Sequence, residues 1–341
     1  MSDSRHVTDV VVVGAGPVGL FAIFECGMVR LKCHVVDALD AIGGQCTALY
    51  PEKPIYDIPG HPRIDAADLV RALGEQAAPF APVYHLGQTV DRLDRQDDGA
   101  WRVTTSKGVE IVAKAVLIAA GVGAFGPNRP PLPDIERYEG DAVQYYVKRR
   151  EDFRGKRVVI AGGGNSAVDW ALSLVDVAAR IMVVHRRPKF RAAPDSEAKL
   201  MALADSKRLD LVIPYQLDSL EGDGKSLRAV IVATLDGEKR RLEADTLLPF
   251  FGLAMELGPI AHWGLDLERS LITVDPATCA TNLPAVFAVG DIVSYPGKLK
   301  LILCGFSEAA MAARAIYPLV HPDTPLHFEY STTSGVPGAA R

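Results

Sequence analysis

The chain lacks any pair of cysteines in the Cys-x-x-Cys spacing, and it has few cysteines altogether. An odd number of cysteines at scattered spacings fits neither a disulfide framework nor a zinc site. We therefore expect no metal site, no stabilising disulfide and no dithiol that relays electrons. The five cysteines are Cys26, Cys33, Cys46, Cys279 and Cys304.

The chain also lacks a net positive charge, a long apolar run and a recognisable leader. A net charge of -5 argues against general nucleic-acid binding and against adhesion to anionic lipid. No apolar run approaches the length that crosses a bilayer, and residues 1–6 do not show the basic-then-apolar pattern of a signal peptide. We expect a cytoplasmic protein that binds neither nucleic acid nor membrane.

Glycine-rich loops are present twice, and each follows a valine-rich strand and opens a helical pattern. The first loop holds Gly14, Gly16 and Gly19, directly after the apolar run of residues 9–13. In such a unit the first glycine makes the turn, the second permits approach of a pyrophosphate, and the third permits close packing. The pyrophosphate then rests on unpaired N–H groups at the helix N-terminus. The alternative is a tight turn that binds nothing.

An acidic residue follows the first loop at the distance that a dinucleotide site requires. Asp37 ends the next strand, residues 33–37, where a carboxylate accepts hydrogen bonds from an adenosine ribose. A carboxylate at this point would repel a 2′-phosphate. The first loop is therefore predicted to bind a dinucleotide with an unmodified ribose.

The second loop is followed by basic residues in place of an acid. It contains Gly162, Gly164, Asn165, Ser166 and Ala167, and the next strand, residues 181–184, leads into His185, Arg186, Arg187, Lys189 and Arg191. Guanidinium groups pair with phosphate oxygens in a bidentate manner, so this loop suits the extra phosphate of NADPH. A solvated basic loop is the alternative reading.

The pattern along the chain predicts an α/β protein with two Rossmann-like, three-layer ββα nucleotide-binding domains. With 341 residues, of which 48% are hydrophobic, the chain is long enough for two cores. The turn-rich segment 126–133 indicates a crossing between domains. We place an FAD-binding domain at residues 1–121 and 252–341, with an NADPH-binding domain, residues 122–251, inserted into it.

The last part of the chain is expected to return to the first domain. The apolar run 286–289 leads into Gly290-Asp291, and an acid at the end of a buried strand requires a polar partner. If this strand completes the first sheet, Asp291 can bind the ribityl hydroxyls of a flavin. Asp291 could instead be a simple helix cap.

With these residues in view, the chain resembles the thioredoxin-reductase-like ferredoxin–NADP⁺ reductases over about residues 7–335. Thioredoxin reductases share the glycine loops but lack the other matching segments. Those segments are Leu49-Tyr50-Pro51-Glu52-Lys53, residues 163–170, His185-Arg186-Arg187, Gly290-Asp291 and residues 295–300.

The resemblance implies a set of FAD contacts in this sequence. Tyr50 would stack on one face of the isoalloxazine, and Tyr330 would cover the other face from the partner subunit of a homodimer. Either aromatic could instead belong to a core. The full set is Val18, Asp37, Gln45, Tyr50, Val90, Phe125, Asp291, Tyr330 and Thr332, in addition to the first glycine loop. The family usually has Asp where this chain has Asn165, and loss of that charge should ease the approach of phosphate.

The activity implied is hydride transfer between NADPH and flavin N5, coupled to one-electron exchange with ferredoxin, whose 2Fe-2S or 4Fe-4S type stays open. Hydride transfer needs no side-chain acid, base or nucleophile, so we expect no catalytic residue. His61 and Cys46 are the alternatives, but Pro51 stands where a second cysteine of a redox disulfide would be. A helix over about 301–316, with Lys298 and Lys300 near its start, is expected to supply positive potential to the flavin.

Three rival functions follow from the same residues. Thioredoxin reductase requires a dithiol beside the flavin, which this sequence does not provide. A reductase of flavodoxin, free flavin or a quinone would use the same two cofactors. A nucleotide-binding sensor or scaffold would keep both glycine loops without turnover.

Overall fold

The computed structural model of the chain describes residues 5–327, 332 and 335–337, with the backbone alone for residues 124–127 and 253–255. The chain forms two compact units. Unit 1 comprises Met1–Phe125 with Met255–Arg341, and unit 2 comprises Gly126–Ala254. The connecting strands β9 (Ala124–Pro127) and β17 (Leu253–Glu256) pair as a two-stranded sheet. Unit 2 is thus an insertion in unit 1, as predicted.

Unit 1 is built on a seven-stranded sheet with strand order β5-β2-β1-β8-β7-β6, and β20 also pairs with β8. Strands β5, β2, β1, β8 and β20 are parallel, and β6 and β7 are antiparallel. The strands are β1 (Arg5–Val13), β2 (Cys33–Asp37), β5 (Val83–Leu86), β6 (Val90–Arg95), β7 (Trp101–Thr105), β8 (Glu110–Ile118) and β20 (Val286–Ala288).

Strand β20 joins the sheet at the last residues of β8, where Val286 pairs with Val116 and Ala288 with Ile118. The first residues of β8 pair instead with β7. The expected return of the chain to the first sheet is therefore confirmed. Because parallel strands end at the same edge, Asp291 lies near the loops that follow β1 and β8.

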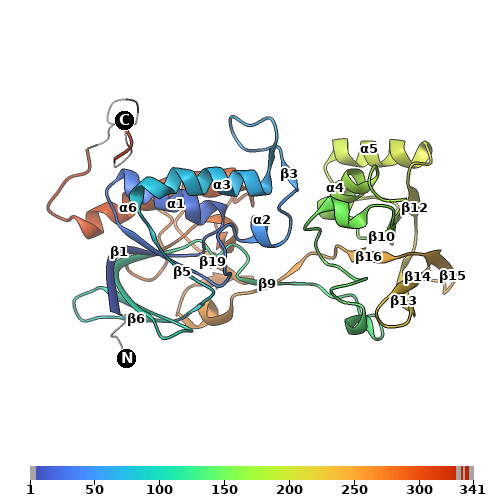
Figure 1. The fold of residues 1–341 in the computed structure, drawn as a ribbon. Coiled ribbons are helices and arrows are strands. Elements are labelled where there is room, and N and C mark those ends of the chain that lie inside the picture. Colours follow the sequence, from blue (N-terminus) through green and yellow to red (C-terminus); the bar gives the residue numbers. More distant parts are fainter. Residues whose placement is uncertain (1–4, 328–331, 333–334, 338–341) are drawn as a thin grey trace. The chain divides into compact units, whose positions relative to one another are not determined.

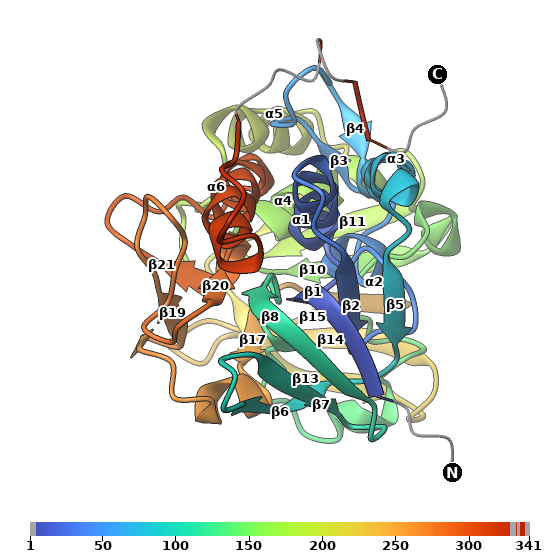
Figure 2. The same cartoon turned by 90° about the vertical axis from the view of Figure 1, so that its left-hand side faces the viewer.

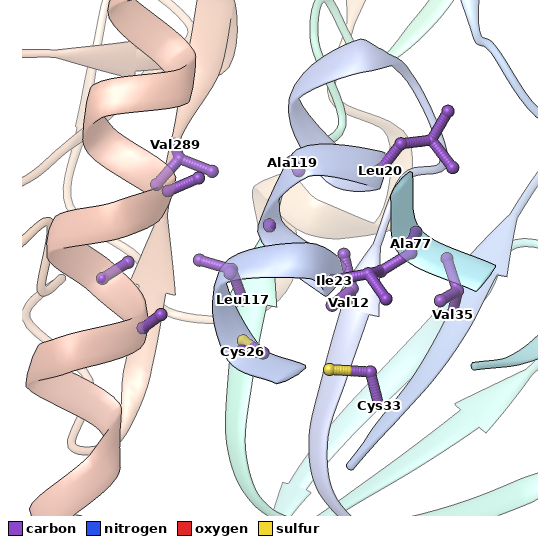
Figure 3. Packing of buried hydrophobic residues seen from close by; sticks show 14 of the residues in the cluster. Val12, Leu20, Ile23, Cys26, Cys33, Val35, Ala77, Leu117, Ala119 and Val289 are labelled. Carbon is purple, nitrogen blue, oxygen red and sulfur yellow. The ribbon is translucent and has the colours of Figure 1, made fainter. Parts of the chain in front are cut away.

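Helices cover one face of this sheet and smaller strands cover the other (Figures 1 and 2). Figure 3 shows Ile23 beside Val12, and Leu20, Val35 and Leu117 belong to the same buried cluster. Each such buried side chain contributes about 1.5–3 kcal/mol. The helices are α1 (Pro17–Met28), α2 (Gln45–Ala48), α3 (Ala66–Ala77) and α6 (Ile302–Val320). The short elements are β3 (Pro54–Ile55), β4 (Ile64–Asp65), β18 (Leu267–Glu268), β19 (Leu271–Thr273), β21 (Val293–Ser294), η1 (Ala78–Phe80), η4 (Gly258–His262) and η5 (Gly290–Ile292).

Unit 2 repeats the same layering on a smaller scale (Figure 1). A parallel sheet of order β12-β11-β10-β16 carries helices α4 and α5 on one face, and an antiparallel sheet β13-β14-β15 covers the other. Val159 and Met182 of the first sheet pack with Val230 and Leu242 of the second. The elements are β10 (Arg157–Ala161), α4 (Asn165–Leu174), β11 (Arg180–Val184), α5 (Pro194–Asp205), β12 (Asp210–Val212), β13 (Gln216–Gly222), β14 (Leu227–Ala233), β15 (Lys239–Glu243), β16 (Thr246–Pro249), η2 (Ile135–Arg137) and η3 (Arg150–Phe153).

Both units thus have the predicted three-layer ββα arrangement, in which each parallel sheet is buried on its two faces. Among the described residues, every helix falls short of the length or the apolarity that a bilayer crossing requires.

Candidate functional site

Unit 1 contains a cavity of about 370 Å³ at the carboxyl edge of its parallel strands. Its lining includes Val13 at the end of β1, Asp37 at the end of β2 and Ala119 just after β8. In open α/β sheets this edge, where the strand order reverses, is the usual place of a ligand.

The first glycine loop forms one wall of the cavity. Gly14 has a φ of +109°, and a Cβ there would stand 2.5 Å from the carbonyl oxygen of Ala119. A Cβ on Gly19 would be 2.0 Å from the oxygen of Gly14, so this glycine packs behind the loop. A Cβ on Gly16 would meet nothing within 4 Å, because this backbone faces the cavity. The loop therefore exposes backbone where a phosphate can approach it.

Helix α1 begins at the glycine loop without a side-chain cap. Its N-cap residue is Gly16, and Pro17 opens the helix with no N–H of its own. Val18, in the first turn, lines the cavity. The uncapped N-terminus of a twelve-residue helix carries partial positive charge and suits an anion.

Asp37 fixes the glycine loop as well as lining the cavity. Its carboxylate accepts a 2.6 Å hydrogen bond from the Ala15 N–H and a 2.8 Å bond from the Leu39 N–H. Burial raises the pKa of Asp37, and the two backbone hydrogen bonds oppose that rise. Each oxygen keeps a lone pair for a ligand hydroxyl.

Tyr50 and Cys46 lie together at another wall of the cavity. Burial raises the pKa of the Cys46 thiol to about 11, although its hydrogen bond with Tyr50 and the charge of Lys53 oppose the rise. Burial likewise raises the pKa of Tyr50. The ammonium of Lys53 stands 5.6 Å from the centre of the Tyr50 ring. The thiol is therefore protonated at neutral pH, which is the state least suited to attack.

Asp291 lines the cavity from the turn after β20, and α6 begins beside it, with Ile302 also in the lining. The expected helix N-terminus is thus at the cavity. The expected role of Lys298 differs, because its ammonium forms an ion pair with the buried Glu308. Lys298 therefore does not provide a free positive charge there, whereas Lys300 is exposed.

The structure brings together most of the residues that the sequence indicated for FAD. The cavity is lined by Gly14, Gly16, Val18, Asp37, Gln45, Tyr50, Val90 and Asp291. Phe125 lies on β9, but its side chain is outside the described residues, as is the whole of Tyr330. Thr332 is exposed, and His61 is exposed and not in the lining.

Sequence reasoning missed one wall, which is formed by Leu257, Gly258, Pro259, Ile260 and Trp263. This segment at η4 carries no glycine motif and no charged pattern. The one feature of the sequence that could have indicated this wall is its position just after the chain re-enters unit 1.

The chemistry of this lining fits FAD. A backbone wall at a helix N-terminus suits a pyrophosphate, and the buried Asp37 and the half-buried Asp291 suit ribose and ribityl hydroxyls. An aromatic ring and apolar side chains suit a flat, largely apolar ring system.

The second glycine loop, in unit 2, is packed against the loop that carries the basic residues. A Cβ on Gly163 would stand 2.1 Å from the His185 ring, so the imidazole lies directly on the glycine backbone. The ring of His185 also stacks on Phe190, at 5.1 Å between centroids. Burial lowers the pKa of His185, and the charges of Arg186, Arg191 and Arg187 lower it further.

Two hydrogen bonds attach this basic loop to the glycine loop. The Arg191 N–H donates to the Gly163 carbonyl at 2.6 Å, and the Ala193 N–H donates to the Asn165 side-chain oxygen at 2.9 Å. Asn165, the one departure from the expected motif, thus connects the start of α4 to the basic loop through its side-chain hydrogen bond.

Arg186, Arg187 and Arg191 are exposed, and no carboxylate partner is found for them in the described part of the chain. By contrast, Arg154 and Arg157 of the same unit pair with acids. A group of uncompensated guanidinium groups beside a helix N-terminus is a favourable place for a phosphate.

Within residues 5–327, 332 and 335–337, no cluster of His, Cys, Asp and Glu side chains is arranged to hold a metal ion. All five cysteines are free thiols, and four of them are buried. Cys46 is the one cysteine that lines the cavity of unit 1.

Comparison with known proteins agrees with this geometry. Residues 8–313 match the family described as pyridine nucleotide-disulphide oxidoreductase. A ferredoxin–NADP reductase of Paramagnetospirillum magneticum is 65% identical over 98% of this chain and 99% of its own length. One of Granulibacter bethesdensis is 63% identical over 97% of this chain and 95% of its own.

Solved structures show the same fold at lower identity. Thioredoxin reductase of Lactococcus lactis is 24% identical with a TM-score of 0.80, over 92% of this chain and 99% of its own. That of T. acidophilum is 23% identical with the same TM-score, over 92% of this chain and 98% of its own. The chain therefore belongs to the pyridine nucleotide-disulphide oxidoreductase family, and within it to the ferredoxin–NADP reductases.

Proposed function

We propose that this protein is an FAD-dependent ferredoxin–NADP⁺ reductase that works without a redox-active disulfide. The observation that carries the proposal is the lining of the unit 1 cavity, in which Cys46 is the one cysteine among the described residues. Reduction of a protein disulfide requires a dithiol pair beside the flavin. The curated relatives are named for ferredoxin and NADP, and we take both as substrates here.

FAD, when bound in unit 1, supplies the chemistry that converts a hydride donor into a source of single electrons. The residues of the chain hold and orient it. We assign the pyrophosphate to the loop of Gly14 and Gly16, the ribose to Asp37 and the ribityl chain to Asp291. Tyr50 supplies a stacking face, and Gln45, Val18 and Val90 complete the contacts. Phe125, Thr332 and a partner subunit's Tyr330 remain part of the proposed site.

NADPH is assigned to unit 2. Gly162, Gly164, Ser166 and Ala167 form the phosphate loop at the start of α4. Because the loop of Arg186, Arg187 and Arg191 is attached to that start, its guanidinium groups are available to the 2′-phosphate. His185, which lies on Gly163, gives this loop a rigid base.

The test compares electron acceptors with a single preparation under anaerobic conditions. NADPH should bleach the visible absorbance of the bound flavin, and reduced 2Fe-2S or 4Fe-4S ferredoxin should form with a higher kcat/KM than a small dye gives. Thioredoxin serves as the disulfide control and should not be reduced. A preference for flavodoxin, free flavin or a quinone would reassign the acceptor, and a flavin that NADPH leaves oxidised would contradict an enzymatic role.

We also propose that the protein is a cytoplasmic homodimer. Free thiols throughout the chain are typical of a reducing compartment. A homodimer would allow Tyr330 to cover the second face of the flavin. Sedimentation of the holoprotein should give twice the chain mass, and Tyr330→Ala should leave that mass unchanged while altering the flavin spectrum.

A further inference from the structure

Glu308 is a charged residue in the middle of α6 and is only 1% exposed. Its carboxylate accepts a 2.7 Å hydrogen bond from the Gly290 N–H and a 2.6 Å bond from the Tyr295 hydroxyl. The ammonium of Lys298, whose side chain is 6% exposed, forms an ion pair with the same carboxylate. Three donors from one short stretch of chain therefore converge on a single buried acid.

The stretch that Glu308 holds carries a residue of the flavin cavity. Gly290 begins the turn η5 with a φ of +84°, and its neighbour Asp291 lines the cavity. Without the carboxylate, the buried Gly290 N–H would lose its acceptor, which is unfavourable for a donor shielded from water. The hydrogen bond from Gly290 therefore fixes the turn directly beside Asp291.

Helix α6 is itself fixed against the glycine loop. A Cβ on Gly305 would stand 2.4 Å from a methyl group of Val18, so α6 and α1 are in direct contact. Glu308 lies one turn further along α6. Glu308 thus links the turn that contains Asp291 to a helix that packs against the phosphate loop.

Protein stability alone does not explain why Glu308 and Lys298 form a buried ion pair. A buried pair of charges is seldom more stable than apolar side chains of the same size, whereas removal of one partner leaves the other uncompensated. A positional role for Glu308 explains why charged groups occupy this place. Burial raises the pKa of Asp291, Lys298 and Lys300 oppose that rise, and Glu308 adds to it.

We propose that Glu308 is a positioning residue for FAD, which presents Asp291 to the cofactor by holding the Gly290 N–H, while Lys298 neutralises its charge. This proposal rests on the assignment of FAD to unit 1. The side chain at position 308 has two properties that substitutions can test separately. One is the oxygen that accepts the hydrogen bond from Gly290, and the other is the negative charge that Lys298 balances.

The experiment measures the dissociation constant of FAD from the purified protein by flavin fluorescence, together with the visible spectrum of the bound flavin and the urea midpoint. Glu308→Gln leaves Lys298 without a counter-charge, and Lys298→Met leaves Glu308 without one. We expect each to weaken FAD binding by roughly tenfold or more. The double variant Glu308→Gln/Lys298→Met keeps the acceptor and removes both charges, and its FAD binding should return to within about threefold of the unaltered protein.

The matched control is Glu308→Leu/Lys298→Met, which is also free of buried charge but offers no acceptor to Gly290. It should bind FAD at least roughly tenfold more weakly than the Gln/Met variant. Asp245→Asn, which removes one of the two acidic partners of Arg157 in unit 2, controls for general loss of stability and should leave FAD binding unchanged.

Equal FAD affinity and equal flavin spectra in the two double variants would overturn the proposal. A Gln/Met variant that does not fold would overturn it as well, because the ion pair would then serve folding itself. Should either single variant fail to fold, the comparison of the two double variants decides. If the unaltered protein binds no FAD, the proposed function fails instead, so the two failures are distinguishable.

Discussion

Asp37 ends strand β2 of unit 1 and Arg186 follows strand β11 of unit 2, and the two residues carry opposite charges. Asp37 is buried and bonded to the first glycine loop, whereas Arg186 is exposed beside the second. A carboxylate accepts hydrogen bonds from ribose hydroxyls, and a guanidinium group binds a phosphate on the same ribose. We therefore propose that this difference in charge directs the two units to different dinucleotides.

The exposed arginines lead to a prediction on cofactor preference. Arg186→Ala should reduce the preference for NADPH over NADH, as a ratio of kcat/KM, by roughly ten- to a hundredfold, because a charged hydrogen bond contributes about 1.5–3 kcal/mol. Arg154→Ala, which removes an arginine already paired with Glu151, is the control and should leave the ratio unchanged. An unchanged ratio in both Arg186→Ala and Arg187→Ala would show that the phosphate assignment is wrong.

The buried thiol of Cys46 leads to a prediction on pH. Since its pKa is raised to about 11, only about one thiol in a thousand is ionised at pH 8. Iodoacetamide should therefore modify the half-buried Cys304 before Cys46 in the native protein, as measured by mass spectrometry of peptides. The rate at Cys46 should rise as the pH approaches 11. Modification of Cys46 at pH 8 as fast as that of a small exposed thiol would contradict this account.

At the scale of elements, the loop of residues 185–193 is held by a few specific contacts with the start of α4. The Asn165–Ala193 hydrogen bond is one, and the backbone bond from Arg191 to Gly163 is another. Both join segments that are nearly thirty residues apart in the chain. The basic loop is therefore attached directly to the glycine loop, where we propose that the phosphate binds.

Asn165→Ala removes the side-chain acceptor and should loosen this loop. We expect faster trypsin cleavage at Arg186, Lys189 and Arg191, and roughly two- to tenfold weaker binding of 2′,5′-ADP by calorimetry. Asn165→Asp keeps the acceptor, so its cleavage should match the unaltered protein, while its added negative charge should still weaken 2′,5′-ADP binding. The proposed role of the Asn165 hydrogen bond in holding this loop would be refuted if the alanine variant matched the unaltered protein in both measurements.

Local signals in the sequence were sufficient for the main elements and for much of the cavity. The positions of Gly14 and Asp37 follow from backbone geometry within one βαβ unit, which short-range spacing records. The hydrogen bond from Gly290 to Glu308 and the wall at Trp263 could not be predicted, because they depend on how distant segments meet. Lys298 illustrates the limit: its charge was visible in the sequence, but its buried partner was not.

At the scale of the whole molecule, a net charge of -5 coexists with Arg186, Arg187 and Arg191 of unit 2, which have no acidic partner among the described residues. Ferredoxins are typically acidic, so we expect docking on a basic surface. Turnover with ferredoxin should fall as salt rises from low ionic strength, since screening weakens charge attraction. Turnover with a neutral quinone provides the control and should change little. A ferredoxin rate that is independent of salt would argue against electrostatic docking.

The insertion of unit 2 has a consequence for the order in which the protein matures on the ribosome. The first 125 residues emerge without β20, and the turn that bears Asp291 is translated only after the whole of unit 2. Since domains fold as they emerge, the inserted unit can fold while its host still lacks a strand. A nascent chain halted at the end of unit 2 would therefore contain the whole of the proposed NADPH site but only part of the proposed flavin site.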